Sequence, residues 1–399
     1  MKPYDAIVIG ARCAGSPAAM LLARKGYRVL LVDRAKFPSD TISTHIVVPR
    51  AAAALRRWGL LDGVTESNCP PIHTYAFHFG PVQITGAPGT EDSPNAYCPR
   101  RTVLDKILVD AAVEAGVELR EEFAVDEVLT SNGHVIGIKG RTKDGNPVTE
   151  NATIVIGADG RNSAVAKTVK PETYNEKPVL QASYYSYFAD LPTDGRFDIF
   201  IGDGYGFAAA DTNDGLTMVV GGWQIADHEE KKKNYESNWM NMLESEPGFG
   251  DRVRRARRAD KIYGALTPNF FRKPYGPGWA LIGDAGYQKD PITAQGIMNA
   301  FLDAERCTNA LHSAFSGERS YDEAMSDYQR ERDEDSMPMY ELTCQFATLA
   351  PPPPEMQQLL GGIQGNQRAM DAFAQMNAGT LSPARFFAPD HLGSLMGGA

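Results

Sequence analysis

Residues 5–33, DAIVIGARCAGSPAAMLLARKGYRVLLVD, predict the fold of this chain. An apolar run at 5–10 precedes a glycine-containing turn and a helical pattern at 16–25, and a second apolar run follows at 28–33. Both runs are short and apolar throughout, as in strands that are buried on both faces. The stretch is therefore interpreted as a βαβ unit, which predicts a parallel sheet and an α/β fold.

The composition is typical of a globular protein. The 399 residues are 43% hydrophobic and 23% charged, and 40 basic against 50 acidic residues give a net charge of −10. This length allows two domains, and the negative charge argues against a nucleic-acid partner. The five cysteines are never spaced as CxxC, so we expect neither a disulfide framework nor a metal site, and the cytoplasm is the expected location. Charges follow the first apolar run too soon for a transmembrane segment.

The first loop has the glycines of a dinucleotide-binding turn. Gly10 allows a tight turn, Gly15 lets helix and strand pack closely, and the helix N-terminus at Ala14 presents N–H groups to a pyrophosphate. Asp33 ends the second strand, where it would accept hydrogen bonds from ribose hydroxyls. Arg12 replaces the middle glycine, so its side chain either points away or contributes a cation to the cofactor. An ordinary turn remains the alternative.

Two further turns that combine glycine with an acid follow apolar strands. Asp159 and Gly160 lie in GADGRNS at 157–163, and Asp284 lies in WALIGDAGYQKDPITAQG at 279–296. Each carboxylate is placed to accept hydrogen bonds from a dinucleotide. Pro291 predicts a helix start, whose N–H groups would favour negative charge on a reduced flavin. Taken singly, each turn could also be a plain strand-to-helix connection.

The rest of the chain divides into three patterns. Residues 117–159 alternate between polar and apolar positions and are divided by Ser-Asn-Gly and Asp-Gly-Asn turns, which predicts an antiparallel meander that returns to the sheet. Residues 181–222 predict a second, mostly antiparallel sheet that forms a wall of the substrate pocket. After residue 296 the pattern is helical, and the last helices are expected to pack on the outside.

In this order, the three turns resemble the FAD-dependent oxidoreductase family of the para-hydroxybenzoate hydroxylase fold, which includes the group A flavin monooxygenases and related geranylgeranyl reductase-like and halogenase-like enzymes. Arg101, at the head of a helix running to residue 115, looks like the flavin-contacting arginine of this family, and neighbouring Arg100 is the alternative. The resemblance implies FAD as the cofactor. The residues expected to contact it are Gly10, Arg12, Ala14, Gly15, Asp33, Arg34, Arg101, Asp159, Gly160, Gly283, Asp284, Pro291, Gln295 and Gly296.

The resemblance also implies a domain organisation. A Rossmann-like FAD-binding domain is expected in three pieces, at 1–72, 98–172 and 272–340. A mainly antiparallel β substrate domain, at 73–97 and 175–271, is expected as an insertion. The C-terminal helices at 341–399 complete the chain.

The activity implied by the resemblance is that of a monooxygenase. NADH or NADPH would reduce FAD, O₂ would add to form a flavin C4a-hydroperoxide, and a small or medium aromatic or polycyclic substrate would be hydroxylated. The chain lacks the Trp-x-Trp-x-Ile-Pro pattern of halogenases and the Tyr-x-Trp-x-Phe-Pro stretch of isoprenoid reductases, so hydroxylation is favoured partly by elimination. Reduction of an unsaturated isoprenoid-like or secondary-metabolite substrate is the alternative, and a non-catalytic FAD- or ligand-binding protein is a third. A monomer and a homodimer are both open.

His45 is the candidate catalytic residue, as a base that deprotonates a phenol-like substrate. The alternative is a hydrogen-bonded structural histidine, which is the commoner role. Aromatic side chains on alternating strands can line a pocket or fill a core. The residues expected to line the substrate pocket are Tyr185, Tyr205, Phe207, Trp223 and Gln224.

Overall fold

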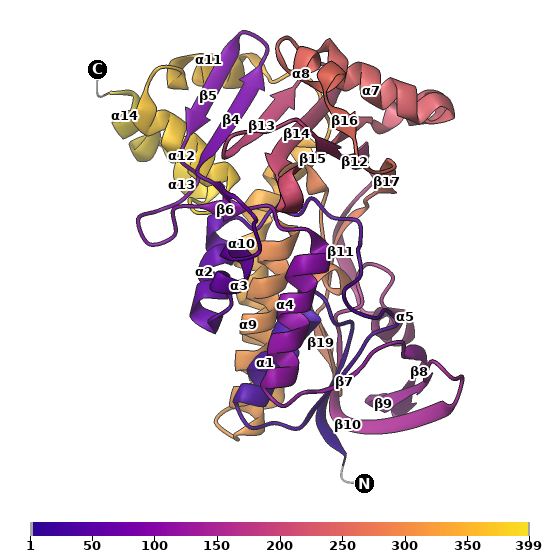
Figure 1. Cartoon of the computed structure of the whole chain (residues 1–399). Coiled ribbons are helices and arrows are strands. Elements are labelled where there is room, and N and C mark those ends of the chain that lie inside the picture. The colour runs from indigo at the N-terminus through magenta and orange to yellow at the C-terminus, as the bar shows by residue number, and fades with distance from the viewer. Residues whose placement is uncertain (1–2, 398–399) are drawn as a thin grey trace.

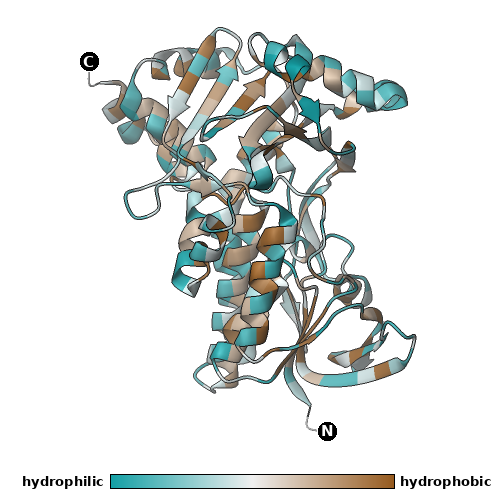
Figure 2. Cartoon of the chain, viewed as in Figure 1, coloured by the Kyte–Doolittle hydropathy of each residue, from teal (hydrophilic) through white to brown (hydrophobic). Residues whose placement is uncertain are grey.

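The computed structural model describes residues 3–397. A parallel sheet and an antiparallel sheet lie at opposite ends of the molecule, and two long helices run beside them (Figure 1). The N-terminus lies at the end with the parallel sheet, and the C-terminal helices lie beside the antiparallel sheet. In Figure 2 hydrophobic and hydrophilic residues alternate along the long helices, and the buried apolar residues of helices and strands form one cluster. The core therefore lies between sheets and helices.

The parallel sheet has the order β19-β20-β10-β1-β2-β7. β1 pairs in parallel with both β10 and β2, so the N-terminal strand lies inside the sheet. This confirms the predicted α/β fold with a parallel sheet. The strands are β1 (Tyr4–Ile9), β2 (Val29–Val32), β7 (Glu118–Arg120), β10 (Pro147–Gly157), β19 (Tyr275–Gly276) and β20 (Trp279–Leu281).

The predicted meander is confirmed as β8 (Ala124–Ser131), β9 (His134–Arg141) and β10. Asn132 and Gly133 take positive φ values of 50° and 77° in the first turn, and Gly145 takes 79° in the second. These values suit Asn and Gly, which enter the left-handed region most easily. β10 serves two sheets, because its first half pairs antiparallel with β9 and its second half pairs in parallel with β1.

Helices cover the parallel sheet and continue to the other end of the molecule. α1 packs against α4 and α9, and α9 packs along α10. Their facing side chains belong to one apolar core, which also takes in α2. The helices are α1 (Gly15–Arg24), α2 (Pro49–Trp58), α3 (Leu61–Thr65), α4 (Arg101–Glu114), α5 (Ala164–Val169), α9 (Gly296–Phe315) and α10 (Tyr321–Phe346).

The second sheet is mainly antiparallel, as predicted, with the order β16-β12-β15-β14-β13-β4-β5 and β17 beside β12. β13 and β4 form its parallel pair. One face packs against α7 and α8. The elements are β4 (Thr74–Phe79), β5 (Val82–Gly86), β12 (Gln181–Ala189), β13 (Arg196–Ile201), β14 (Tyr205–Asp211), β15 (Leu216–Gln224), α6 (His228–Lys231), α7 (Tyr235–Ser245), α8 (Phe249–Arg255), β16 (Arg257–Arg258) and β17 (Tyr263–Leu266).

Short strand pairs lie where the chain passes between the two sheets. They are β3 (Pro71–Ile72) with β6 (Ala96–Tyr97), and β11 (Thr173–Lys177) with β18 (Asn269–Arg272) and β21 (Tyr287–Gln288). These pairs lie close to the predicted domain limits, whereas the limit at 340 falls inside α10.

The C-terminal helices are α11 (Pro354–Ile363), α12 (Gln367–Asn377), α13 (Pro383–Phe386) and α14 (Pro389–Met396). α12 packs against β5, so these helices cover one edge of the antiparallel sheet. Across residues 3–397, the structure contains no helix that combines the length and hydropathy needed to span a membrane.

Candidate functional site

The three glycine turns meet at the carboxyl edge of the parallel sheet. A β-carbon at Gly10 would lie 2.4 Å from the carbonyl oxygen of Ala158, which follows β10. A β-carbon at Gly283 would lie 3.0 Å from the β-carbon of Ala14, so the third turn touches the start of α1. A β-carbon at Gly15 would lie only 1.7 Å from the Gly10 carbonyl oxygen. The fold thus brings together turns that lie far apart in sequence, and two of these contacts require glycine.

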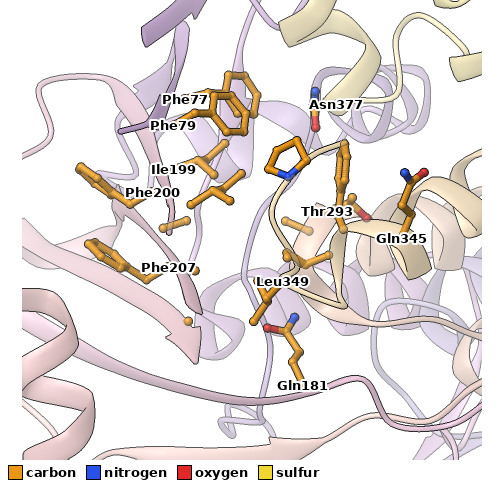
Figure 3. Close-up of a pocket in the computed structure, with 18 of the residues that line it drawn as sticks. Phe77, Phe79, Gln181, Ile199, Phe200, Phe207, Thr293, Gln345, Leu349 and Asn377 are labelled. Carbon is orange, nitrogen blue, oxygen red and sulfur yellow. The ribbon is translucent and has the colours of Figure 1, made fainter. Parts of the chain in front are cut away.

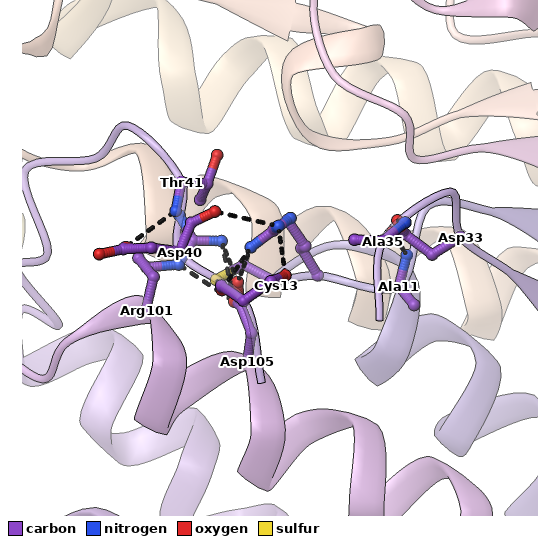
Figure 4. Close-up of polar contacts among 10 residues, drawn as sticks. Ala11, Cys13, Asp33, Ala35, Asp40, Thr41, Arg101 and Asp105 are labelled. Carbon is purple, nitrogen blue, oxygen red and sulfur yellow. Dashed lines mark hydrogen bonds and ion pairs between the residues drawn. The ribbon is translucent and has the colours of Figure 1, made fainter. Parts of the chain in front are cut away.

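Asp33 ties the end of β2 to the first turn (Figure 4). Its Oδ2 accepts from the Ala11 N–H and its Oδ1 from the Ala35 N–H, both at 2.7 Å. A carboxylate oxygen has a second acceptor position, so these bonds leave Asp33 able to accept from ribose hydroxyls. Arg34 lies beside it and is exposed.

The Arg12 side chain extends away from the first turn. Its guanidinium donates to Asp105 Oδ2 at 2.5 Å and to Ser39 Oγ at 2.9 Å, and it lies 5.3 Å from the centre of the Phe37 ring. The sequence left two alternatives for Arg12, a side chain that points away and one that contributes a cation to the cofactor. The observed position is the first, and it leaves space above the backbone of the turn.

Arg101 is buried and paired with Asp105 one helical turn further along α4 (Figure 4). Its Nε and Nη2 donate to Asp105 Oδ1 at 3.0 and 2.8 Å. The Cys13 thiol donates to the same oxygen at 3.4 Å, and burial raises the pKa of this thiol. Two arginines and a thiol therefore converge on one buried carboxylate. Sequence reasoning missed Asp105, although its i,i+4 spacing from Arg101 is a recognisable signal.

Asp159 provides an unused acceptor at the second turn. Its Oδ2 accepts from the Ala164 N–H at 2.6 Å, whereas its buried Oδ1 has no partner among residues 3–397. Burial raises the pKa of Asp159. The buried hydroxyl of Ser16, in the first turn of α1, likewise has no partner in this part of the chain. Buried polar atoms are rarely left unpaired, so both atoms fit hydrogen bonds to a bound dinucleotide.

The third turn differs from the predicted helix start. Pro291–Thr293 form a single 3₁₀ turn, Ala294 takes a φ of 51°, and α9 begins at Gly296. The left-handed Ala294 breaks the helical path, which is why the predicted start at Pro291 is wrong. The N-cap residue Gln295 makes no side-chain capping bond, and a β-carbon at Gly296 would meet no atom within 4 Å. The start of α9 therefore presents uncapped N–H groups beside open space.

Asp284 lies in a 3₁₀ turn at Gly283–Ala285. The protein surrounds it, and this burial raises its pKa, against the opposing charge of Arg101. Its side chain is nevertheless exposed to solvent. Asp284 therefore lines an opening within the molecule, where its side chain reaches solvent although protein surrounds it. A carboxylate in such a place can accept hydrogen bonds from a ligand.

An apolar cavity of about 240 Å³ lies between the antiparallel sheet and the C-terminal part of the chain (Figure 3). One wall comes from β4, β13, β14 and β15, and the other from residues 291–294, the end of α10, the proline-rich segment 350–353 and α12. Among the described residues that line it, none carries a charge. Residues labelled in Figure 3 include Phe77, Phe79, Gln181, Ile199, Phe200, Phe207, Thr293, Gln345, Leu349 and Asn377.

Of the residues predicted to line the substrate pocket, Phe207 borders this cavity. Tyr205 and Trp223 pair across β14 and β15 and pack towards α7 and α8, in the same apolar cluster as Phe207. Tyr205 donates to Glu246 there. Neither Tyr205 nor Trp223 lines this cavity, although Tyr205 and Phe207 lie two residues apart on the same face of β14.

The other two predicted pocket residues lie outside the cavity lining. Tyr185 stacks on Tyr263 with ring centres 5.1 Å apart, and Gln224 ends β15. Sequence reasoning missed Phe77 and Phe79 of β4, although TYAFHF at 74–79 alternates in the way a half-buried strand does.

His45 is fully buried with a positive φ of 64°. Its Nδ1 lies 2.7 Å from the Ser43 carbonyl oxygen, which must accept, so Nε2 accepts from the Tyr187 hydroxyl at 2.7 Å. Burial, reinforced by the charge of Arg101, lowers its pKa to about 3. The ring is thus neutral and bonded at both nitrogens, while neighbouring Thr44 borders the cavity. This geometry favours the structural alternative.

Asp290 and Gln181 connect the third turn with the cavity wall. The Gln181 side-chain amide N–H donates to Asp290 Oδ1. Burial raises the pKa of Asp290 to about 7, and its Oδ2 has no partner within residues 3–397. Gln181 borders the cavity, so the carboxyl group lies one side chain away from a bound ligand. Sequence reasoning missed both residues.

No group of three or more His, Cys, Asp or Glu side chains in residues 3–397 is arranged to hold a metal ion.

The site agrees with comparisons to known proteins. A family model described as "FAD binding domain" matches residues 3–342. Digeranylgeranylglycerophospholipid reductase of Methanocella arvoryzae is 24% identical over 343 residues, covering 82% of this chain and 82% of the relative. Monooxygenase CTB7 of Cercospora beticola is 25% identical over 347 residues, covering 75% of this chain and 76% of the relative. The myxobacterial chondrochloren halogenase CndH has the same fold, with a TM-score of 0.81 at 22% identity over 95% of this chain and 97% of that structure.

The match and the geometry point to one cofactor. The family model covers the strands, the three turns and α9, where the unpaired oxygens of Ser16 and Asp159 and the uncapped start of α9 suit a dinucleotide. These residues fit FAD. The chain therefore belongs to the FAD binding domain family, and its fold and relatives place it among the FAD-dependent oxidoreductases of the para-hydroxybenzoate hydroxylase type.

Proposed function

We propose that this protein is an FAD-dependent monooxygenase that uses NADH or NADPH and O₂ to hydroxylate an aromatic or polycyclic substrate. The observation that carries this proposal is the uncharged, aromatic-rich cavity bordered by residues 291–294. That segment forms the third turn of the dinucleotide site, so a molecule in the cavity would lie next to the flavin. Bound FAD would supply electron transfer from the nicotinamide to O₂ and the substrate.

The residues proposed to hold FAD fall into three groups. Gly10, Ala14 and Gly15 would approach the pyrophosphate closely. Asp33, Asp159 and Asp284 would accept hydrogen bonds from FAD hydroxyl groups. The start of α9 at Gly296 would place N–H groups against the flavin ring. Arg12, Arg34, Arg101, Gly160, Gly283, Pro291 and Gln295 complete the proposed set.

The cavity residues themselves exclude water and orient the substrate. Phe77, Phe200 and Phe207 border an apolar space that suits a flat ring system. The buried Tyr75 hydroxyl has no partner among residues 3–397 and borders the same space. Gln181 donates its amide N–H to Asp290, which leaves its carbonyl oxygen to accept from a substrate hydroxyl. A substrate with one hydroxyl and one further polar group would match these positions.

A reductase is the second candidate. Its support is the similarity to digeranylgeranylglycerophospholipid reductases along most of the chain, and an apolar cavity also suits an unsaturated lipid-like substrate. The compact size of the cavity, about 240 Å³, favours a ring system over a long isoprenoid chain. For either activity we expect a cytoplasmic protein, supported by five cysteines that form no disulfide.

A ligand screen of the purified flavoprotein tests the proposal. We expect an aromatic ligand to accelerate NAD(P)H oxidation with matching O₂ consumption, and the product to gain one oxygen atom by mass spectrometry. Ile199→Trp, which fills the cavity, should abolish the acceleration, whereas Ile136→Trp on exposed β9 should retain it. A product that gains two hydrogens without O₂ consumption would identify the reductase, and a flavin that NAD(P)H never reduces would identify a binding protein.

A further inference from the structure

A second cavity, of about 440 Å³, lies on the other side of the third turn. Residues 291–294 border the apolar cavity, whereas Lys289 and Gln295, just outside that segment, border the second one. The two linings share no residue. The other contributors come from α2, residues 90–93, the start of α9, the middle of α10 and the loop 379–383, and they include Arg50, Asn299, Asp335, Ser336, Met298, Met339 and Leu381.

Lys289 gives this cavity a buried cation. The residue is 9% exposed, and its ammonium donates to Gln295 Oε1 at 3.0 Å. None of the ion pairs found among residues 3–397 includes it. Burial lowers its pKa to about 7. A buried charge without a counter-charge is costly, and an ammonium has three N–H groups, so one neutral acceptor leaves it incompletely satisfied.

Asp335 is the carboxylate whose charge acts on Lys289, and two arginines already neutralise it. Asp335 of α10 pairs with Arg50 at 2.9 Å and with Arg306 at 2.7 Å. These hydrogen bonds outweigh burial and hold the pKa of Asp335 below its usual value. Asp92, which also borders the cavity, is an exposed residue and is screened by solvent. The net charge around Lys289 is therefore positive when its amine is protonated.

We propose that the second cavity is a binding site for a small organic carboxylate. The carboxylate would accept hydrogen bonds from Lys289 Nζ, and its apolar part would lie against Met298, Met339 and Leu381. Charge-assisted hydrogen bonds of this kind are stronger than neutral ones, particularly in a low-dielectric site. This inference goes beyond the proposed oxygenation and does not depend on it.

Competitive amine labelling of the purified holoprotein tests the site directly. Trace acetylation followed by peptide mass spectrometry gives the relative rate at Lys289, with Lys143, whose side chain is 67% exposed, as the internal reference. We expect propionate to slow labelling of Lys289 several-fold and to leave Lys143 unchanged. Equal rates with and without propionate or benzoate would overturn the proposal. Equal protection by chloride or phosphate would overturn the organic carboxylate as the ligand.

A pair of variants provides a second readout. Saturation-transfer NMR with propionate should give a signal with the wild-type protein and with Lys143→Met, and lose it with Lys289→Met. The Lys289→Met variant keeps an unbranched apolar side chain and removes the unpaired charge, so its thermal midpoint at pH 6 should not fall. Lys289→Gln keeps a hydrogen-bonding group and is the control for a packing defect in the Lys289→Met variant. Lowered midpoints in both variants, with the propionate signal retained, would show a purely structural lysine.

Discussion

His45 illustrates how a single buried side chain couples stability to pH. Its folded-state pKa is about 3, against an ordinary value of 6.5. Above pH 6.5 the ring is neutral in both states and its stabilisation is complete. Between pH 6.5 and 3 the unfolded chain takes up a proton that the folded protein excludes, so stability is lost as the pH falls.

We expect His45→Asn to remove this contribution. Asn tolerates the positive φ at this position, and the variant should be about 1–2 kcal/mol less stable at pH 7 through loss of the Tyr187 hydrogen bond. The wild-type protein should then lose about 1.4 kcal/mol per pH unit relative to the variant as the pH falls below 6.5. Denaturant unfolding at pH 7, 5.5 and 4.5 measures this. Parallel pH profiles for the two proteins would contradict the expectation.

The same variant separates a structural role from the predicted base. A catalytic base would make kcat/KM depend on the ionisation of His45, and the substitution would remove that pH dependence. An unchanged pH profile for kcat/KM, with the altered stability profile, would leave His45 as a positioning residue for Tyr187.

Two carboxylates on α4 have the same i,i+4 relation to a cation but different surroundings. Asp105 is fully buried with Arg101, whereas Asp110 and its partner Lys106 are largely exposed. We expect Asp105→Asn to cost about 3–5 kcal/mol, because it leaves Arg101 buried without its counter-charge. Asp110→Asn should cost about 0.5 kcal/mol. Denaturant unfolding of both variants with and without FAD tests this, and similar losses would show that burial does not set the strength of these pairs.

The start of α1 allows an element-level test of the cofactor site. A β-carbon at Gly15 would lie 1.7 Å from the Gly10 carbonyl oxygen, so Gly15→Ala must separate α1 from β1. We expect a marked loss of FAD affinity, measured by flavin fluorescence during titration of the apoprotein. Gly393→Ala in α14 meets no atom within 4 Å and should raise stability by about 0.5–1 kcal/mol without changing FAD affinity. Unchanged FAD affinity in Gly15→Ala would argue against this turn as the FAD contact.

The elements built from local signals could be predicted from the sequence. Glycine positions and apolar runs locate β1, α1, β2 and the meander, because a turn or strand depends mainly on neighbouring residues. The start of α9 could not be placed, since Ala294 takes a left-handed conformation that its residue type does not favour. Which residues of β14 border the cavity could not be predicted either, because Tyr205 and Phe207 share one face of the strand and only the packing of distant elements distinguishes them.

At the scale of the whole molecule, the apolar cavity is a product of tertiary packing. Phe77 of β4 lies 4.9 Å, ring centre to ring centre, from Phe373 of α12. These residues are nearly three hundred positions apart, and no local pattern connects them. The prediction that the last helices pack on the outside is therefore incomplete, because α12 and the proline-rich segment also wall the cavity.

We expect Phe373→Ala to loosen the packing of the C-terminal helices against the antiparallel sheet. Phe373 is 2% exposed, and its loss from a packed core should cost about 3–5 kcal/mol. Hydrogen exchange should become faster in residues 354–396, while β1 and β2 keep their protection, since the C-terminal helices make their main contacts with β5, α10 and one another. Val113→Ala, at a half-exposed position on α4, is the control and should leave exchange in both regions unchanged. Uniformly faster exchange in Phe373→Ala would mean that the molecule opens as one unit.

The interior position of β1 has a consequence for biosynthesis. β1 and β2 leave the ribosome early, but β10, which pairs with β1, and β20, which pairs with β10, follow only after residues 147 and 279 have been translated. For most of synthesis the nascent sheet has an unpaired apolar edge, which is the feature that chaperones protect and that aggregates when unprotected. The third turn arrives last, so the cofactor can enter only after nearly three-quarters of the chain has been made. Flavin supply would then influence the yield of soluble protein, and riboflavin limitation during expression should increase the aggregated fraction.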